Sequence, residues 1–313
     1  MLEGGNGRIG GADAVRQVIG VDIGGTGIKG LGVREDGRVL AEAARATDAR
    51  LGREAILAKL RELIDELIVQ LPEAQAIGIA SAGRVNAETG EVVYATDNLP
   101  GWQGMPLTAW AASQFGLPAA AENDANAALL GEVWLGAGRG KDELVMLTLG
   151  TGVGGAHMTA GRLVRGARWS GGDWGHSVLV PGGRLCNCGK RGCVEQYISG
   201  TALVRLGHEL TGRAYGHGRE LMAEADKGEA AAVEVLERYT SAVALVADNI
   251  AVAVDPELII IGGGVIHDQA TWWPLLLNKL GAAAVVAAEL GNRAGCFGVA
   301  KLVLDRLSEN RIR

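Results

Sequence analysis

The sequence predicts an α/β protein built from two similar lobes with a cleft between them. Short apolar segments alternate with an amphipathic helical segment, which is the order of an α/β unit. A Gly/Thr-rich turn follows the first apolar segment, and another follows a later one. Each turn precedes a second apolar run and a Gly-Arg turn. This recurrence indicates an internal duplication.

The first copy of the pattern starts near the N-terminus. Residues 18–23 and 28–33 are short apolar strands on either side of a glycine turn, and a third strand starts at Val39. The segment 54–70 has apolar residues at the spacing of an amphipathic helix, and 76–80 reads as a buried strand. Meander, helix and strand together form one α/β unit.

The second copy repeats this order further along the chain. Residues 144–155 contain an apolar strand and a Gly/Thr turn, and 160–163 echo the Gly-Arg turn of the first copy. Glycine-rich turns can resemble one another by chance, but the matching order of strand and turn favours duplication. The remaining chain is expected to be helical over 199–254, to form a strand at 258–261, and to form helices at 272–280 and 294–307.

These elements divide the chain into four parts. We expect a flexible N-terminal arm at 1–16, a first lobe at 17–118, a second lobe at 119–293, and a closing helix at about 294–313 that returns to the first lobe. The Ala-, Val- and Leu-rich segment 231–253 has few polar residues, so we expect it to be a buried helix.

Length, charge and cysteine content exclude several classes of protein. The chain has 313 residues and a formal net charge of −6, which disfavours nucleic-acid binding. No apolar stretch approaches the roughly 18 residues that span a bilayer, and residues 1–17 lack the apolar core of a signal peptide. We therefore expect a cytoplasmic protein with no membrane or nucleic-acid partner. Four cysteines in such a chain do not indicate a disulfide framework.

Three glycine turns, each after an apolar strand, predict a nucleotide site. One such turn alone is ordinarily a hairpin, but three together favour phosphate binding by backbone N–H groups. In this interpretation Asp22 holds the hydration shell of Mg²⁺, Lys29 offsets phosphate charge, and the third turn lies against adenine. The chain lacks a Walker-type P-loop and a dinucleotide fingerprint. The candidate residues are Asp22, Gly24, Gly25, Thr26, Lys29, Gly150, Thr151, Gly152, Gly262, Gly263 and Gly264.

A cluster of cysteines with one histidine predicts a structural zinc site. His176 is followed by Cys186, Cys188 and Cys193, so the zinc loop is expected at 176–193. Three thiolates and one imidazole complete a tetrahedral zinc set and leave no open position for catalysis. The alternative is three buried free thiols near an unrelated histidine. Cys296 lies far from the other three cysteines in the sequence, and we expect it to be a small core residue.

Carboxylates around these motifs predict a site for a polyhydroxylated substrate. Asp124 is the candidate general base for a substrate hydroxyl, and Asn123 would bind the neighbouring hydroxyl. At a helix start both residues could equally be capping residues. Asp173, His176 and Glu195 frame the zinc loop, where they could accept hydrogen bonds from sugar hydroxyls or form structural ion pairs.

Taken together, these residues resemble the ROK family, which contains sugar kinases and related sugar-responsive repressors. The matching motifs run from about residue 17 to the C-terminal helix, and the zinc loop is the most specific of them. The resemblance implies a duplicated actin-like, ribonuclease-H-like fold. It also implies ATP with Mg²⁺ as phosphoryl donor, a hexose as acceptor, a structural Zn²⁺ and a homodimer.

The resemblance also assigns roles to residues. It implies that Asp124 is the catalytic base and that Asn123 binds the sugar beside it. It implies that His176 both ligates zinc and contacts the sugar, and that Glu195 is a second sugar carboxylate. The remaining positions with an implied sugar contact are Gly83, Arg84, Thr96 and Asp173.

One departure from the family pattern bears on the sugar. Where the family usually has glutamate, this chain has Asp173, which is one methylene shorter. Glucose phosphorylated at the 6-hydroxyl is the first expectation. Arg84 and Asp173 keep N-acetylmannosamine and N-acetylglucosamine as alternatives. A sugar sensor is a remote alternative, because the Gly-rich residues before the first turn leave no room for a DNA-binding domain, and a silent sugar-binding scaffold conflicts with the retained Asp22 and Asp124.

Overall fold

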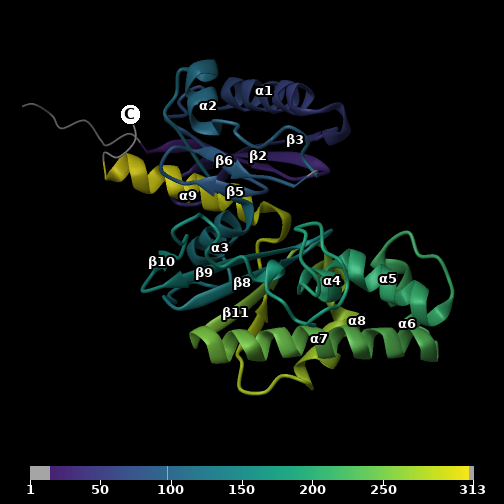
Figure 1. Ribbon diagram of the computed structural model, residues 1–313. Helices are drawn as coiled ribbons and strands as arrows, with labels where there is room; N and C mark the ends of the chain where they lie inside the picture. Colours follow the sequence, from purple (N-terminus) through teal and green to yellow (C-terminus); the bar gives the residue numbers. More distant parts are fainter. Residues whose placement is uncertain (1–14, 97, 310–313) are drawn as a thin grey trace, which may run out of the picture.

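A computed structural model describes residues 15–96 and 98–309 of the chain. The expected N-terminal arm lies almost entirely outside the described residues, as does the end of the closing helix. Figure 1 shows two lobes, each with a sheet covered by helices, and the helix α9 between them. The prediction of a two-lobed α/β fold is confirmed.

The first sheet has five strands among the described residues, in the order β3-β2-β1-β4-β7. β1 pairs antiparallel with β2 and parallel with β4, which in turn pairs parallel with β7. The helices α1 and α2 pack on one face of this sheet, around the side chains of Ile19, Leu63 and Ile79. The bounds are β1 Gln17–Ile23, β2 Gly27–Arg34, β3 Val39–Ala46, α1 Arg53–Gln70, β4 Ile77–Ser81, α2 Leu107–Phe115 and β7 Ala119–Asn123.

The second sheet repeats this topology in the order β10-β9-β8-β11-β12. Here β8 pairs antiparallel with β9 and parallel with β11. The helices α4 to α8 cover one face, and α7 is the long green helix in Figure 1. The bounds are β8 Leu144–Leu149, β9 Val153–Thr159, β10 Arg162–Leu163, α4 Glu195–Ile198, α5 Gly200–Thr211, α6 Gly218–Asp226, α7 Ala230–Val254, β11 Leu258–Gly262, α8 Gln269–Leu277 and β12 Val285–Ala287.

Short elements connect these layers. A hairpin of β5 and β6 forms a separate two-stranded sheet beside the first one (Figure 1). Single turns of 3₁₀ helix occur at four connections. The bounds are η1 Ala49–Leu51, β5 Arg84–Asn86, β6 Glu91–Tyr94, η2 Trp174–His176, η3 Gly264–Asp268 and η4 Gly291–Arg293.

The two lobes exchange their last helices. α3 (Asp124–Leu135) follows the last strand of the first sheet but packs on the second sheet, against Met146 and Ile260. α9 (Ala294–Ser308) follows the second sheet but packs on the first, against Val18 and Leu31. α3 and α9 also contact each other so closely that a Cβ on Gly298 would lie 1.6 Å from the Ala127 carbonyl oxygen.

Two details differ from expectation. β7 belongs to the first sheet, so that sheet runs to Asn123 and not to residue 118; the reason is that its buried alanines pair in register with β4. The helix α7 is buried on one face only. Leu245 and Val252 on its other face are 51% and 89% exposed, because the sheet and α5, α6 and α8 occupy one side of it.

Candidate active site between the lobes

A cavity of about 480 Å³ lies between the lobes, and both lobes contribute to its lining. The first lobe supplies the segment after β4 and the end of β7. The second lobe supplies the turn between β8 and β9, the segment 169–176 and Glu195. The predicted sites for sugar and phosphate therefore meet in one space.

Most of the predicted site residues line this cavity. All of the predicted sugar contacts do so: Gly83, Arg84, Thr96, Asn123, Asp124, Asp173, His176 and Glu195. Of the predicted nucleotide residues, six do so: Gly25, Thr26, Gly150, Thr151, Gly152 and Gly263. Five are not part of the lining and lie behind or beside it: Asp22, Gly24, Lys29, Gly262 and Gly264.

Asn123 and Asp124 stand where β7 passes into α3. The side chain of Asn123 caps the helix, because its Oδ1 accepts a hydrogen bond from the Asn126 N–H at 3.0 Å. Its Nδ2 donates to the Gly83 carbonyl at 2.7 Å and to Asp124 Oδ1 at 2.9 Å. Capping and positioning are thus performed by the same side chain, and the Asp124 carboxylate is held facing the cavity.

The environment of Asp124 suits a proton acceptor. Burial raises its pKa to about 6, although hydrogen bonds from the Ala125 N–H and from Asn123 favour the charged form. A carboxyl with a pKa in this range is ionised near neutral pH and still binds a proton more readily than an exposed aspartate. It can therefore accept the proton of a substrate hydroxyl.

Asp22 lies at the end of β1, opposite Lys29 in the register of the sheet. Burial raises its pKa to about 7; the Asp124 carboxylate adds to the shift and Lys29 opposes it. Gly295, in the first turn of α9, approaches it so closely that a Cβ there would lie 2.6 Å from Asp22 Oδ2. Two carboxylates with raised pKa values and a single nearby lysine make a site that a hydrated cation would stabilise, so the donors fit the predicted Mg²⁺.

Two of the three glycine turns, those after β8 and β11, lie at the same end of the second sheet. Because β8 and β11 run parallel, the turn after β8 and the turn after β11 lie at the same end. The first of them is closed by a hydrogen bond from the Gly150 N–H to the Gly152 carbonyl at 3.0 Å. Gly263 has a φ of 88° and packs against the backbone of Leu149, where a Cβ would lie 2.5 Å from the carbonyl oxygen. No larger residue fits there without displacing the turn.

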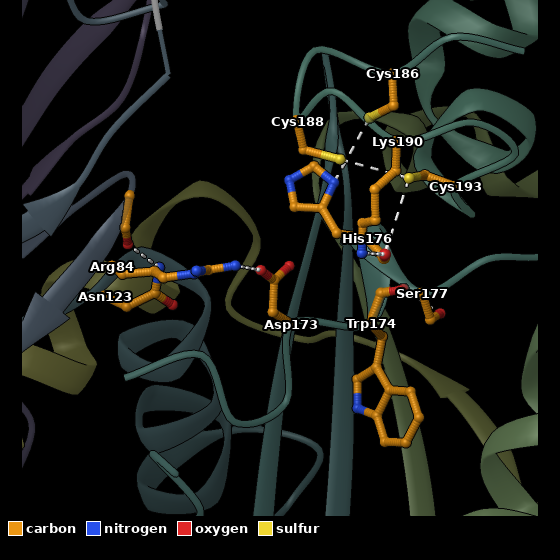
Figure 2. Close-up of polar contacts among 11 residues, drawn as sticks. Arg84, Asn123, Asp173, Trp174, His176, Ser177, Cys186, Cys188, Lys190 and Cys193 are labelled. Carbon is orange, nitrogen blue, oxygen red and sulfur yellow. Dashed lines mark hydrogen bonds and ion pairs between the residues drawn. The ribbon is translucent and has the colours of Figure 1, made fainter. Parts of the chain in front are cut away.

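Arg84 and Asp173 form an ion pair across the cleft. A terminal guanidinium nitrogen of Arg84 donates to Asp173 Oδ2 at 3.2 Å, and Figure 2 shows Arg84 reaching from the first lobe to the aspartate on the second. The guanidinium also lies over the Tyr94 ring, 5.0 Å from its centroid. Among the described side chains, the buried Nε of Arg84 has no hydrogen-bond partner. The shorter carboxylate at position 173 is thus held by an arginine at the cavity wall.

The four predicted metal ligands converge behind this wall. Cys186 Sγ lies 3.7 Å from His176 Nδ1, Cys188 Sγ lies 3.6 Å from Cys193 Sγ, and all four ligand atoms lie within 4.8 Å of one another. A tetrahedral zinc with Zn–S bonds of about 2.3 Å separates its sulfur ligands by about 3.8 Å. The three thiols and the imidazole, visible together in Figure 2, therefore fit a zinc ion.

Glu195 connects the metal cluster to the cavity. Its Oε2 accepts a hydrogen bond from the Val153 N–H at 3.1 Å, and its Oε1 lies 3.6 Å from Cys186 Sγ. It begins α4, immediately after the loop that carries the cysteines. His176 belongs to the loop, Glu195 directly follows it, and both line the cavity, so a metal that fixes the loop also restrains these two side chains.

Sequence reasoning missed an ion pair that supports the site. Glu122 is buried at the end of β7, and its Oε2 accepts a hydrogen bond from Arg165 Nε at 2.8 Å. A terminal guanidinium nitrogen of Arg165 forms an ion pair with the same oxygen at 2.7 Å. Its Oε1 accepts from the Asn123 N–H and from Asn126 Nδ2, both at 3.0 Å. A glutamate inside an otherwise apolar strand was a signal of a buried partner. The identity of the partner, 43 positions later, was not readable from the sequence.

Comparison with known proteins identifies relatives of this chain. The ROK family model matches residues 18–306. A glucokinase of Thermotoga maritima is 36% identical over 313 aligned residues, which cover 93% of this chain and 98% of that protein. An N-acetyl-D-glucosamine kinase of Escherichia coli is 33% identical and covers 91% of this chain and 98% of its own.

Solved structures agree with the sequence relatives. A ROK family glucokinase from Streptomyces griseus, solved in complex with glucose and AMPPNP, is 33% identical with a TM-score of 0.75, over 91% of this chain and 98% of that one. Among the described residues, no helix has the length and apolarity needed to cross a membrane. The repeated sheet, the cleft and the matched length lead to one conclusion: the chain belongs to the ROK family.

Proposed function

We propose that the protein is an ATP-dependent hexose kinase that transfers the γ-phosphoryl group to the 6-hydroxyl of glucose, with Asp124 as the general base. The observation that carries this proposal is the position of Asp124, which faces a cavity shared by the sugar-binding candidates and the glycine turns. Relatives named glucokinase, matched over nearly their whole length, support the same activity.

The residues divide the work of phosphoryl transfer. Such transition states are loose, so positioning and charge stabilisation supply most of the catalysis. Asp124 orients the acceptor hydroxyl and takes its proton, which typically contributes about 10²–10⁴-fold to the rate. The backbone N–H groups around Thr26 and Thr151 bind the phosphate oxygens. Asp22 would hold the Mg²⁺ ion that binds with ATP, and that ion would neutralise phosphate charge.

The sugar is held by groups from both lobes. Asn123 and Glu195 offer an amide and a carboxylate to the ring hydroxyls, and His176 offers the imidazole nitrogen that the metal does not use. Asp173 accepts from hydroxyls while Arg84 keeps it in place. Closure of the lobes over the sugar excludes water and suppresses ATP hydrolysis.

An N-acetylhexosamine is the second candidate substrate. The observation that favours it is the Arg84–Asp173 ion pair, which holds the short carboxylate at the cavity wall. The N-acetyl-D-glucosamine kinase relative supports this candidate.

A coupled ADP-release assay with Mg-ATP tests the proposal and separates the two candidates. The panel is glucose, mannose, fructose, N-acetylglucosamine and N-acetylmannosamine. We expect the highest kcat/KM with glucose; a higher value with an N-acetyl sugar assigns the second candidate. Turnover with none of the five, beside measurable glucose binding by calorimetry, would refute the kinase and indicate a sensor or scaffold.

The base is tested in the same assay with Asp124→Asn. The amide cannot accept the proton, so kcat should fall by about 10²–10⁴-fold. The amide still hydrogen-bonds the hydroxyl, so glucose affinity measured by calorimetry should stay within about threefold. Near-normal turnover would remove Asp124 from the mechanism.

Two further properties belong to the proposal. We infer one structural zinc ion per chain, held by His176, Cys186, Cys188 and Cys193, in a cytoplasmic enzyme. We also infer a homodimer; the exposed apolar side chains of Leu245 and Val252 on α7 support an interface on that helix. Metal analysis and sedimentation equilibrium test the two statements.

A further inference from the structure

One residue of the cavity wall has a strained backbone. Trp169 lines the cavity and has a φ of 59°, in the left-handed region. The other described non-glycine residues with positive φ are Asp48, Ala160 and Asp255, which are small or short polar residues and do not line the cavity. A bulky aromatic residue in this region is an outlier, and such strain persists mainly where the surroundings enforce it.

The surroundings of Trp169 do enforce it. The segment 165–171 is closed on itself by a hydrogen bond from the Gly171 N–H to the Arg165 carbonyl at 2.9 Å. The side chain of Arg165 is in turn fixed to the buried carboxylate of Glu122 by one hydrogen bond and an ion pair. The same carboxylate holds the backbone of Asn123. The loop that carries Trp169 is therefore anchored to the strand end that presents Asn123 and Asp124.

The composition of the cavity lining indicates what the indole of Trp169 can bind. Most of the lining residues are polar or glycine, and besides the imidazole of His176 the lining includes two residues with large aromatic rings, Tyr94 and Trp169. The guanidinium of Arg84 already lies over the Tyr94 ring. Trp169 is thus the aromatic surface of the cavity that no described cation covers. A hexopyranose presents hydroxyls at its edge and C–H groups on its faces, and only an apolar wall complements those faces.

We propose that Trp169 is a specificity-determining residue whose indole packs against a C–H face of the hexose ring, and that the loop 165–171 holds it in that place before the sugar arrives. The inference rests on the proposed function for the nature of its ligand. Trp169 adds an apolar contact to the sugar. The nearby residues Asp173 and His176 supply polar contacts in the proposed function.

The test compares Trp169→Asn and Trp169→Phe with the wild-type enzyme. Asparagine tolerates a positive φ, so Trp169→Asn removes the ring without forcing the loop out of its conformation. We expect its KM for glucose to rise about 3–10-fold, the range of one lost aromatic contact. We expect kcat and the KM for ATP to stay within about twofold, and the Tm to equal or exceed that of the wild type. Trp169→Phe should recover most of the glucose affinity.

The matched control is Ala160→Asn. This variant also introduces asparagine at a position with positive φ, but in an exposed turn outside the cavity. It should leave the KM values for glucose and ATP unchanged. An unchanged glucose KM in Trp169→Asn would overturn the inference. So would a rise in both KM values together with a lower Tm, which assigns Trp169 to support of the loop.

Calorimetric titration with glucose in the absence of ATP separates this inference from the proposed function. If the wild type binds glucose but does not turn it over, the kinase proposal fails, and weaker binding by Trp169→Asn still supports the aromatic wall. If the wild type turns over glucose and both proteins bind it equally, the kinase proposal stands and the wall is refuted.

Discussion

At the scale of single residues, the site is a set of carboxylates whose protonation differs with their surroundings. Asp124 is half-buried in the cleft and receives its hydrogen bonds from Ala125 and Asn123, whereas Asp36 on the surface pairs with Arg34, which lowers its pKa. The same side chain is therefore suited to accept a proton in the cleft and to carry a fixed charge in a turn. Position in the fold, and not residue type, determines the difference.

The raised pKa of Asp124 predicts the acid limb of the pH profile. A base acts only when deprotonated, and burial raises the pKa of Asp124 to about 6 in the free enzyme. The kcat/KM for the sugar should therefore fall as the pH decreases through about 6, and should be constant with respect to this group above about 7. Initial rates at saturating Mg-ATP over a pH series measure it. A limb near pH 4, where an exposed aspartate titrates, would contradict the assignment.

The roles of several of these residues could be predicted from the sequence, and those of others could not. Asp124, His176 and the cysteines belong to local motifs, in which a few neighbours in the chain define the chemistry. The partner of Asp173 was not predictable, because Arg84 reaches it across two lobes. Glu122 and Arg165 show the same limit, since a long-range ion pair leaves no local pattern.

At the scale of elements, the zinc loop is a segment with little apolar core of its own. Between η2 and α4 its buried side chains are mainly Cys186, Cys193 and Val194, and Val178 and Leu185 are exposed. A segment of this kind needs a cross-link to be rigid, and the proposed zinc ion would provide it. The rigidity is passed to Glu195, which directly follows the loop.

Loss of one thiolate should therefore remove the metal and loosen the site. Cys188→Ser is expected to lower the zinc content well below one per chain and to reduce the Tm by at least about 5 °C. The KM for the sugar should rise, because His176 and Glu195 lose their fixed positions. Metal analysis and thermal unfolding measure the effect. Cys296→Ala, outside the cluster, should retain full zinc content; equal metal loss in both variants would argue against the site.

The ion pair between β7 and the loop after β10 makes a second prediction for an element. Arg165→Ala leaves the buried Glu122 carboxylate without its cation, which should lower the free energy of unfolding by about 3 kcal/mol. Adding Glu122→Gln should recover most of this loss, since the neutral amide oxygen still accepts from Asn123 and Asn126. Urea unfolding of both variants measures the two values. A double variant less stable than Arg165→Ala would contradict the account.

At the scale of the whole molecule, the duplication could be predicted from the sequence because the same short motifs occur in both halves. Strand, glycine turn, strand and Gly-Arg turn recur, and the two sheets have the same strand order. The predicted second lobe, 119–293, includes α3, and the closing helix was expected to return to the first lobe. The strand before α3 was assigned to the wrong sheet, because the pairing of β7 with β4 is a long-range property that leaves no local pattern.

The exchanged helices predict that the two lobes unfold together. Each sheet is covered on one face by a helix that belongs to the other lobe's chain segment, so neither lobe retains its core alone. Scanning calorimetry should show one transition. Gly298→Ala, which places a Cβ against the Ala127 carbonyl, should reduce hydrogen-exchange protection in β1 and β8 alike. Two separate transitions, or loss of protection in one lobe alone, would contradict this coupling.

The same exchange bears on how such a chain could arise. Two copies of a half-length ancestor, each lending its terminal helix to the other, would form a swapped pair with this arrangement of helices and sheets. Such a pair would assemble only above a certain concentration. Joining the copies end to end makes the association intramolecular, so that it no longer depends on dilution. On that account α3 and α9 would derive from a subunit interface, and the cleft would lie along the former boundary between two subunits.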